Sequence, residues 1–230
     1  MKKHQLILLH FAGGNSHSFN FMLPYLQDFE IIPLELPGRG RRIEEELLRD
    51  FDLAALDIYK QVIGKVNSSK FIIYGHSMGA YLALKVASLL EKANKAPSYI
   101  FVSGNAGPGL ENKTTRYLLG REDFITELKK LGGIPDEVFE YEDMLDFFLP
   151  ILRADFEISE RNQAEIDTLI SSPIYAMMGD QETKVEHITN WKKFTKSHFG
   201  YKIFEGGHFF IHKDYEEVAR LIKDKSRLVL

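Results

Sequence analysis

The most constraining feature of this chain is a five-residue motif between an apolar run and a helical pattern. Residues 75–79 read Gly-His-Ser-Met-Gly, after the strand-like run Phe71–Tyr74 and before a helix-like stretch that continues from Ala80. A serine on a sharp strand-to-helix turn has a strained backbone, and bulk two residues to either side would collide with the neighbouring strand and helix. A chance turn is the alternative, but the flanking patterns favour a nucleophile elbow with Ser77 as nucleophile.

Short apolar runs alternate with helix-length amphipathic stretches, which is typical of a mostly parallel sheet covered by helices. The predicted strands are Leu6–Leu9, Ile31–Leu34, Phe71–Tyr74, Tyr99–Val102, Ile174–Met178 and Tyr201–Phe204. The predicted helices lie near Ser18–Gln27, Asp52–Val66, Met78–Lys92, Glu186–Thr195 and Asp214–Lys223. With 230 residues and no repeat or linker, the whole chain, residues 1–230, is predicted to be one domain of the α/β class.

One segment interrupts the alternation. Approximately residues 114–162 contain no strand pattern, only helical patterns such as Asp123–Lys130 and Tyr141–Leu149. A helical insertion between the fourth and fifth strands predicts a lid over the site.

Composition excludes several classes of function. A formal net charge of −4 gives no reason to expect nucleic acid or an anionic membrane as partner. No apolar run approaches 18 residues, and the N-terminal apolar stretch is too short for a signal peptide, so a cytoplasmic protein is expected. The chain has no cysteine, which excludes disulfides and thiolate ligands. Without a long heptad pattern or apolar seam, we expect a monomer.

A serine nucleophile needs a base to take its proton. His208 is the best candidate, because it follows the last predicted strand after Gly206 and Gly207, which let the loop turn back toward the sheet. His212 lies four residues further on, so a metal-binding pair is an alternative. No glutamate of an H-E-x-x-H pattern and no carboxylate cluster completes such a site, and we expect no metal.

The acid that orients the base should leave the end of a strand between the serine and the histidine. Asp180 does so, and the order Ser77, Asp180, His208 is the order that α/β-hydrolases use. Glu182 is the fallback. The other position for an acid, after the preceding strand, carries Asn105, which cannot stabilise an imidazolium by charge.

Backbone N–H groups should stabilise the oxyanion that forms after attack. The residue after the nucleophile, Met78, is the first predicted donor. Ala12 is the second, because it lies in the loop after the first strand beside Gly13 and Gly14, whose lack of side chains permits close approach. These glycines also fit a tight turn without a catalytic role.

Seven motifs, in order along the chain, resemble the type II thioesterases, the stand-alone editing enzymes of nonribosomal peptide and polyketide synthesis. The motifs are Phe11–Gly14, Leu36–Arg41, Gly75–Ala80, Phe101–Gly104, Leu131–Pro135, Leu152–Phe156 and Gly206–Phe210. The resemblance implies an α/β-hydrolase fold with a helical lid. It implies hydrolysis of acyl thioesters on the phosphopantetheine arm of carrier proteins. It carries over Ser77, Asp180 and His208 as triad, with Met78 and Ala12 as oxyanion donors, and the mechanism needs no cofactor.

Other readings remain open at this point. Thioesterases that release medium-chain fatty acids share much of the pattern, and a carboxylesterase or a non-catalytic receptor would use the same fold. The basic cluster Arg39, Arg41 and Arg42 follows a strand end, where one arginine is placed to meet the pantetheine phosphate or an acidic carrier surface. A structural ion pair is the alternative for Arg39.

Overall fold

The six predicted strands form one parallel sheet. The computed structural model describes residues 3–68, 70–110, 114–161 and 168–227. The strands are β1 (His4–Leu9), β2 (Phe29–Leu34), β3 (Phe71–His76), β4 (Tyr99–Ser103), β5 (Ile174–Gly179) and β6 (Phe199–Phe204). Their order is β2-β1-β3-β4-β5-β6, and each neighbouring pair is parallel. Because the strands run in one direction, their carboxyl ends meet at one edge, where the segments after β1, β3 and β5 come together.

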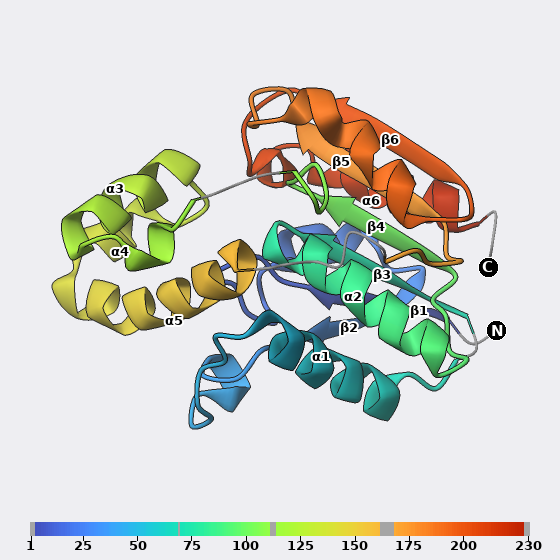
Figure 1. Cartoon of the computed structure of the whole chain (residues 1–230), viewed down its shortest axis with the longest axis horizontal. Coiled ribbons are helices and arrows are strands. Elements are labelled where there is room, and N and C mark those ends of the chain that lie inside the picture. Colours follow the sequence, from blue (N-terminus) through green and yellow to red (C-terminus); the bar gives the residue numbers. More distant parts are fainter. Residues whose placement is uncertain (1–2, 69, 111–113, 162–167, 228–230) are drawn as a thin grey trace.

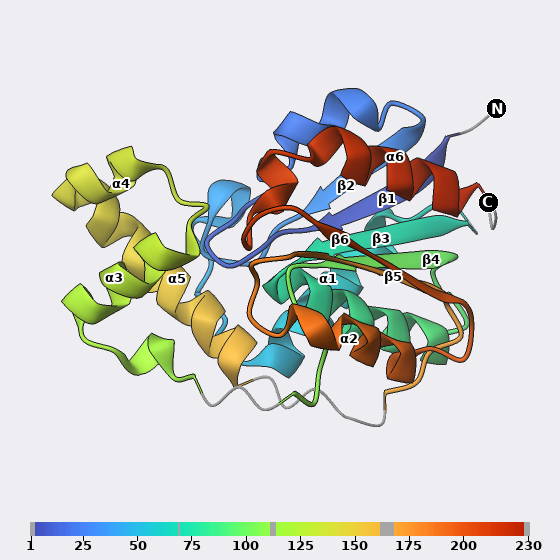
Figure 2. The same ribbon diagram turned by 90° about the horizontal axis from the view of Figure 1, so that it is seen from above.

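Helices cover both faces of the sheet, as Figure 2 shows. One face packs against α1 (Phe51–Lys65), α2 (Met78–Lys92) and the 3-10 helix η4 (Val185–Phe194). The other packs against the 3-10 helix η1 (Asn20–Tyr25) and α6 (Tyr215–Ser226). Alternation along β1 explains how one strand serves both: Ile7 and Leu9 belong to the first cluster, and Leu6 and Leu8 to the second.

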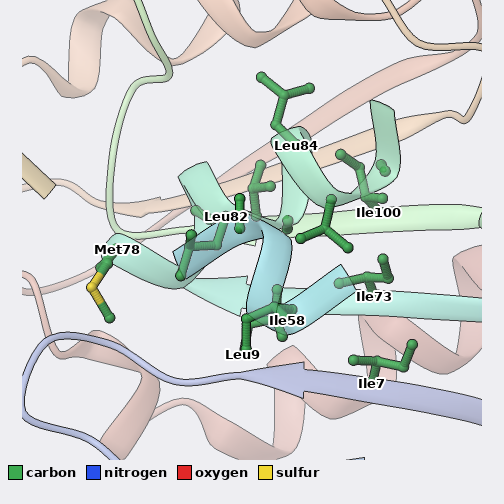
Figure 3. Packing of buried hydrophobic residues seen from close by; sticks show 14 of the residues in the cluster. Ile7, Leu9, Ile58, Ile73, Met78, Leu82, Leu84 and Ile100 are labelled. Carbon is green, nitrogen blue, oxygen red and sulfur yellow. The ribbon is translucent and has the colours of Figure 1, made fainter. Parts of the chain in front are cut away.

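The larger cluster lies between the sheet and the pair α1 and α2 (Figure 3). Ile7, Ile73 and Ile100 come from three neighbouring strands, while Ile58 of α1 and Leu82 of α2 complete the layer; each is 2% exposed or less. Burial of this kind stabilises the fold by about 1.5–3 kcal/mol per large apolar side chain. It also fixes α2, and hence the turn that precedes it, against the sheet.

The predicted helices occur, with two differences of type. The segments expected near Ser18–Gln27 and Glu186–Thr195 form the 3-10 helices η1 and η4. Pro24 lies within η1, and a proline disfavours a continuous α-helix because it lacks the N–H and its ring collides with the preceding turn. Outside the segment between β4 and β5, the described residues also form the 3-10 turns η2 (Gly40–Arg42) and η5 (Phe210–His212).

The segment between β4 and β5 is helical, as predicted, and projects from one end of the sheet (Figure 1). It contains η3 (Arg116–Leu118), α3 (Arg121–Leu131), α4 (Asp136–Glu140) and α5 (Glu142–Glu160). We call residues 116–160 the helical insertion. Its predicted range, 114–162, ends one residue outside the described residues.

Within the described ranges, no helix combines the length and apolarity needed to cross a membrane.

Helix α5 is longer than its sequence pattern predicts. The pattern ended at Leu149, but the helix continues through Pro150 to Glu160. Pro150 cannot donate a backbone hydrogen bond to the preceding turn. Tertiary packing compensates, since apolar residues beyond the proline, including Ile151, Leu152 and Ile158, are buried.

Candidate active site

The elbow has the strained geometry that its sequence predicts. Ser77 lies between β3 and α2 with φ of 56° and ψ of −116°, a conformation rare for any residue other than glycine. A Cβ atom on Gly75 would lie 2.0 Å from the carbonyl oxygen of Gly79, and one on Gly79 would lie 2.2 Å from the carbonyl oxygen of Leu9. Both positions therefore require glycine for strand β1, the turn and helix α2 to approach this closely.

The predicted base reaches the predicted nucleophile. His208 Nε2 lies 3.0 Å from Ser77 Oγ, and His208 Nδ1 lies 2.7 Å from Glu182 Oε2. A carboxylate accepts hydrogen bonds, so the imidazole tautomer that fits this contact carries its hydrogen on Nδ1 and donates it to Glu182. Nε2 is then left with a lone pair that faces the serine hydroxyl, which is the arrangement a general base requires.

The structure corrects the predicted acid. Asp180, expected to orient His208, instead accepts a hydrogen bond from the Gly206 N–H at 2.8 Å, and its side chain is exposed. Glu182, the fallback, contacts the imidazole and is 5% exposed at its side chain. Asp180 thus orders the backbone two residues before His208, while Glu182 touches the ring itself.

The geometry of the turn after β5 explains why Glu182, and not Asp180, contacts His208. Strand β5 ends at Gly179, and the chain turns at once, with the Glu182 N–H donating to the Gly179 carbonyl at 3.2 Å. The turn brings residue 182 back toward the strand end, where its Oε1 accepts from the Gly179 N–H at 2.8 Å. The glutamate side chain is one methylene longer than aspartate and spans the remaining distance to His208. Turn geometry of this kind was not readable from the order of carboxylates alone.

A buried histidine lies behind the base. His76 is 0% exposed, its ring centroid lies 5.0 Å from that of His208, and its Nδ1 lies 2.8 Å from Ser103 Oγ. Burial, with a smaller contribution from the charge of His208, holds the pKa of His76 well below 6.5. His76 is therefore neutral at neutral pH and places no fixed positive charge against an imidazolium formed on His208.

Two residues that the sequence offered as alternatives, Asn105 for the acid position and His212 for a metal site, make structural contacts instead. The Asn105 side-chain amide donates to the Ser77 carbonyl at 2.8 Å, so this alternative acid position ties down the elbow backbone. His212 packs against aromatic rings, with centroids 4.9 Å from Phe21 and 5.3 Å from Phe209. In the described part of the chain, no group of three or more histidine, cysteine or acidic side chains is placed to hold a metal.

The two predicted oxyanion donors come from different elements, Met78 from the start of α2 and Ala12 from the loop after β1. Met78 is the first residue of α2, so its N–H belongs to the turn that lacks intrahelical acceptors. Ala12 lies in a turn closed by a hydrogen bond from the Gly14 N–H to the Phe11 carbonyl at 2.9 Å. Among the described residues, the Ala12 N–H has no protein acceptor. It is available for a negatively charged oxygen.

A cavity of about 1100 Å³ joins these groups to the helical insertion. Ser77, Glu182 and His208 line it, and so do residues of the helical insertion such as Phe148 and Phe156. Apolar side chains within this mixed lining suit an acyl chain whose carbonyl reaches the serine.

The basic cluster divides into paired and exposed members. Arg39 forms a buried ion pair with Asp155, which confirms the structural alternative for this residue. Arg42 pairs with Glu45 and Asp57. Arg41 is the exposed member, and none of the three arginines is among the described residues that line the main cavity.

Comparison with known proteins agrees with this geometry. A family model described as "Thioesterase domain" matches residues 4–226. Gramicidin S biosynthesis protein GrsT of Aneurinibacillus migulanus is 31% identical over 233 residues, covering 99% of this chain and 91% of GrsT. The medium-chain S-acyl fatty acid synthase thioesterase of Rattus norvegicus is 30% identical, covering 93% of this chain and 83% of the rat protein.

Solved structures extend the likeness to the whole fold. ClbQ from the colibactin NRPS/PKS pathway has a TM-score of 0.90 at 26% identity, over 100% of both chains. The type II thioesterase BorB from the borrelidin biosynthetic cluster has a TM-score of 0.89 at 27% identity, over 98% of this chain and 95% of BorB. The predicted α/β-hydrolase fold is thereby confirmed. With a family model over nearly its entire length, the chain belongs to the thioesterase family and is a thioester hydrolase.

Proposed function

We propose that this protein removes acyl groups from the phosphopantetheine arms of carrier proteins, as an editing type II thioesterase of nonribosomal peptide or polyketide synthesis. One observation carries the proposal: Ser77 Oγ, His208 and Glu182 form a continuous hydrogen-bonded relay that opens into the large cavity. The descriptions of two similar structures support the pathway, because BorB is called a type II thioesterase and ClbQ is assigned to an NRPS/PKS pathway.

The residues suggest the following steps. His208 Nε2 takes the Ser77 proton as Oγ attacks the thioester carbonyl, and the N–H groups of Met78 and Ala12 stabilise the oxyanion. The carbon–sulfur bond breaks and the thiol leaves with a proton from His208. Water, activated by the same imidazole, then attacks the acyl-serine, and the free acid departs with Ser77 restored. Glu182 stabilises the imidazolium in both halves.

A panel of acylated carrier proteins tests the proposal. Purified enzyme should release the acyl group from a carrier-bound thioester at a higher kcat/KM than from a nitrophenyl ester of equal chain length, measured by intact-protein mass spectrometry and absorbance. Ser77→Ala is the matched control for both. A preference for the nitrophenyl ester would instead indicate a carboxylesterase.

Release of medium-chain fatty acids is the second candidate, favoured by the 30% identity to the rat enzyme. Carriers loaded with acyl groups from two to about twelve carbons separate the two functions. A sharp optimum at medium chain length, with short acyl groups left in place, would support the fatty-acid role over editing.

The proposal also includes a docking role for the one exposed arginine of the basic cluster. Arg41→Ala should lower kcat/KM for the carrier-bound thioester and leave a small thioester of the same acyl group unaffected, because the charge would meet the carrier or its phosphate. Equal losses on both substrates would dispose of a docking role.

We further propose that the protein is a cytoplasmic monomer. Light scattering after size-exclusion chromatography measures the molar mass in solution, which should equal that of one chain.

A further inference from the structure

A buried ion pair beside the active site has no part in the proton relay. Arg39 is 3% exposed and Asp155 is 0% exposed. Two guanidinium nitrogens of Arg39 contact the two carboxylate oxygens, with Arg39 Nη2 2.7 Å from Asp155 Oδ1. Burial of two charges carries a desolvation cost that their attraction offsets only with good geometry, so such a pair is weak evidence for stability alone.

The pair also binds the loop that carries the second oxyanion donor. Asp155 Oδ2 accepts a hydrogen bond from the Gly13 N–H at 2.7 Å. Leu152, one helical turn earlier in α5, packs on the same residue, since a Cβ on Gly13 would lie 2.5 Å from Leu152 Cδ2. Helix α5 thus contacts the loop directly beside Ala12, at both the backbone N–H and the α-carbon of Gly13.

Backbone carbonyls on either side of Ala12 in the sequence are also paired, those of Phe11 and Gly14. His10 Nδ1 lies 2.8 Å from the Phe11 carbonyl, which also accepts from the Gly14 N–H. Arg39 Nη1 approaches the Gly14 carbonyl at 3.4 Å. Each neighbour of Ala12 is therefore fixed, while the Ala12 N–H stays without a protein acceptor in the described ranges.

The contacts come from the half of α5 that is packed on the body of the protein. Asp155 follows Pro150, in a stretch where Leu152, Ala154 and Ile158 are buried. Before the proline, Phe147 is 52% exposed. The half of the helix after Pro150 therefore contacts the loop, and the half before Pro150 projects from the body of the protein.

We propose that Arg39 and Asp155 are a positioning pair, which sets the direction of the Ala12 N–H and so links the helical insertion to stabilisation of the oxyanion. The inference rests on the proposed function, since Ala12 acts only in a reaction that forms an oxyanion at Ser77. It assigns no contact with substrate to either residue. Its effect passes through Gly13 to the neighbouring backbone.

Asp155→Asn is the direct test. The asparagine keeps an oxygen for Gly13 but loses the charge that fixes it against Arg39. We expect kcat on a small thioester to fall about tenfold to hundredfold, below the full loss of an oxyanion donor, with KM changed less than about twofold. Glu157→Gln is the matched control on the same helix, because Glu157 pairs with Arg49 and Arg161 and should leave kcat unchanged.

Two inhibitors separate positioning from a general structural defect. An acyl trifluoromethyl ketone forms a tetrahedral oxyanion on serine, whereas a thioether analogue of the substrate binds without one. In Asp155→Asn, the ketone should lose affinity by the same factor as kcat/KM, and the thioether should bind as in the wild type. Equal weakening of both inhibitors, or an unchanged kcat, would overturn the proposal.

A second variant serves as the control for loss of folding. If thermal melting shows that Asp155→Asn is unfolded, Arg39→Gln/Asp155→Asn removes the uncompensated charge and takes its place in the same assays, with the same expected and contrary results. Arg39→Lys keeps the charge without the two-pronged contact and should retain more kcat than Arg39→Gln. Failure of the editing function would appear separately, as hydrolysis of small thioesters without hydrolysis of acylated carriers.

Discussion

The strand ends and the helical insertion meet at one cavity but are built differently. At the strand ends, close backbone contacts leave few alternatives: Ser77 has a positive φ, and Gly75 and Gly79 have no room for a Cβ. The insertion has a small core of its own and large apolar side chains at its surface, such as Leu118 at 69% and Tyr141 at 59% exposure. The comparison suggests that the chemistry depends on the constrained region, and that the insertion determines which acyl groups reach it.

Removal of the proposed nucleophile or base should produce the largest effect. Ser77→Ala and His208→Ala should each lower kcat by at least about 10³-fold, because neither the attacking oxygen nor its proton acceptor has a substitute. Turnover is measured on a small thioester, and circular dichroism checks that both variants stay folded. Normal turnover by Ser77→Ala would refute the mechanism.

The two candidate acids should differ strongly. Glu182→Gln should lower kcat by about 10²–10⁴-fold, because an amide cannot stabilise the imidazolium by charge and can donate to Nδ1 in the wrong tautomer. Asp180→Asn keeps an oxygen for the Gly206 N–H and should cost less than about tenfold. Steady-state kinetics of the two isosteric variants make the comparison direct. The reverse ranking would restore Asp180 as the orienting acid.

A pair of adjacent phenylalanines tests the role of the insertion. Phe148 lines the cavity, whereas Phe147 is 52% exposed. Phe148→Ala should raise KM for a long-chain thioester about fivefold to tenfold and change acetyl thioester hydrolysis little, because apolar contact with the chain is lost. Phe147→Ala should leave both nearly unchanged. Uniform effects on kcat for all chain lengths would contradict a role in acyl selection.

A separate expected effect, on folding rather than on catalysis, concerns stability in acid. Burial, with Arg39 adding to it, lowers the pKa of His10 from 6.5 to about 4. The unfolded chain binds this proton more tightly, so the stabilising contribution is present above pH 6.5 and is lost as the pH falls toward 4. Between pH 7 and pH 5 the loss should be about 2 kcal/mol.

Urea denaturation at both pH values measures the effect, with His10→Asn as the comparison. The asparagine variant should lose less stability over the same interval, although its stability at pH 7 is also lower. An identical pH dependence in both proteins would show that His10 is not responsible.

The same contrast explains which parts of the fold and of the candidate site could be predicted from the sequence. Apolar runs predicted all six strands, and the spacing of Gly75, Ser77 and Gly79 predicted the elbow, because local packing dictates both. Glu182 was only a fallback, since its contact depends on a turn after Gly179 that places the longer side chain on the ring. Asp155 was visible only as part of a family motif, because its contact with Gly13 joins residues 142 positions apart.

Labelling with a fluorophosphonate probe tests the central claim most directly, because the probe reacts only with a serine activated by its neighbours. Peptide mass mapping should show one adduct, on Ser77, formed at a wild-type rate in Asp180→Asn and much more slowly in Glu182→Gln and His208→Ala. An unlabelled folded protein, an adduct on another serine, or equal labelling rates in Glu182→Gln and the wild type would contradict the relay.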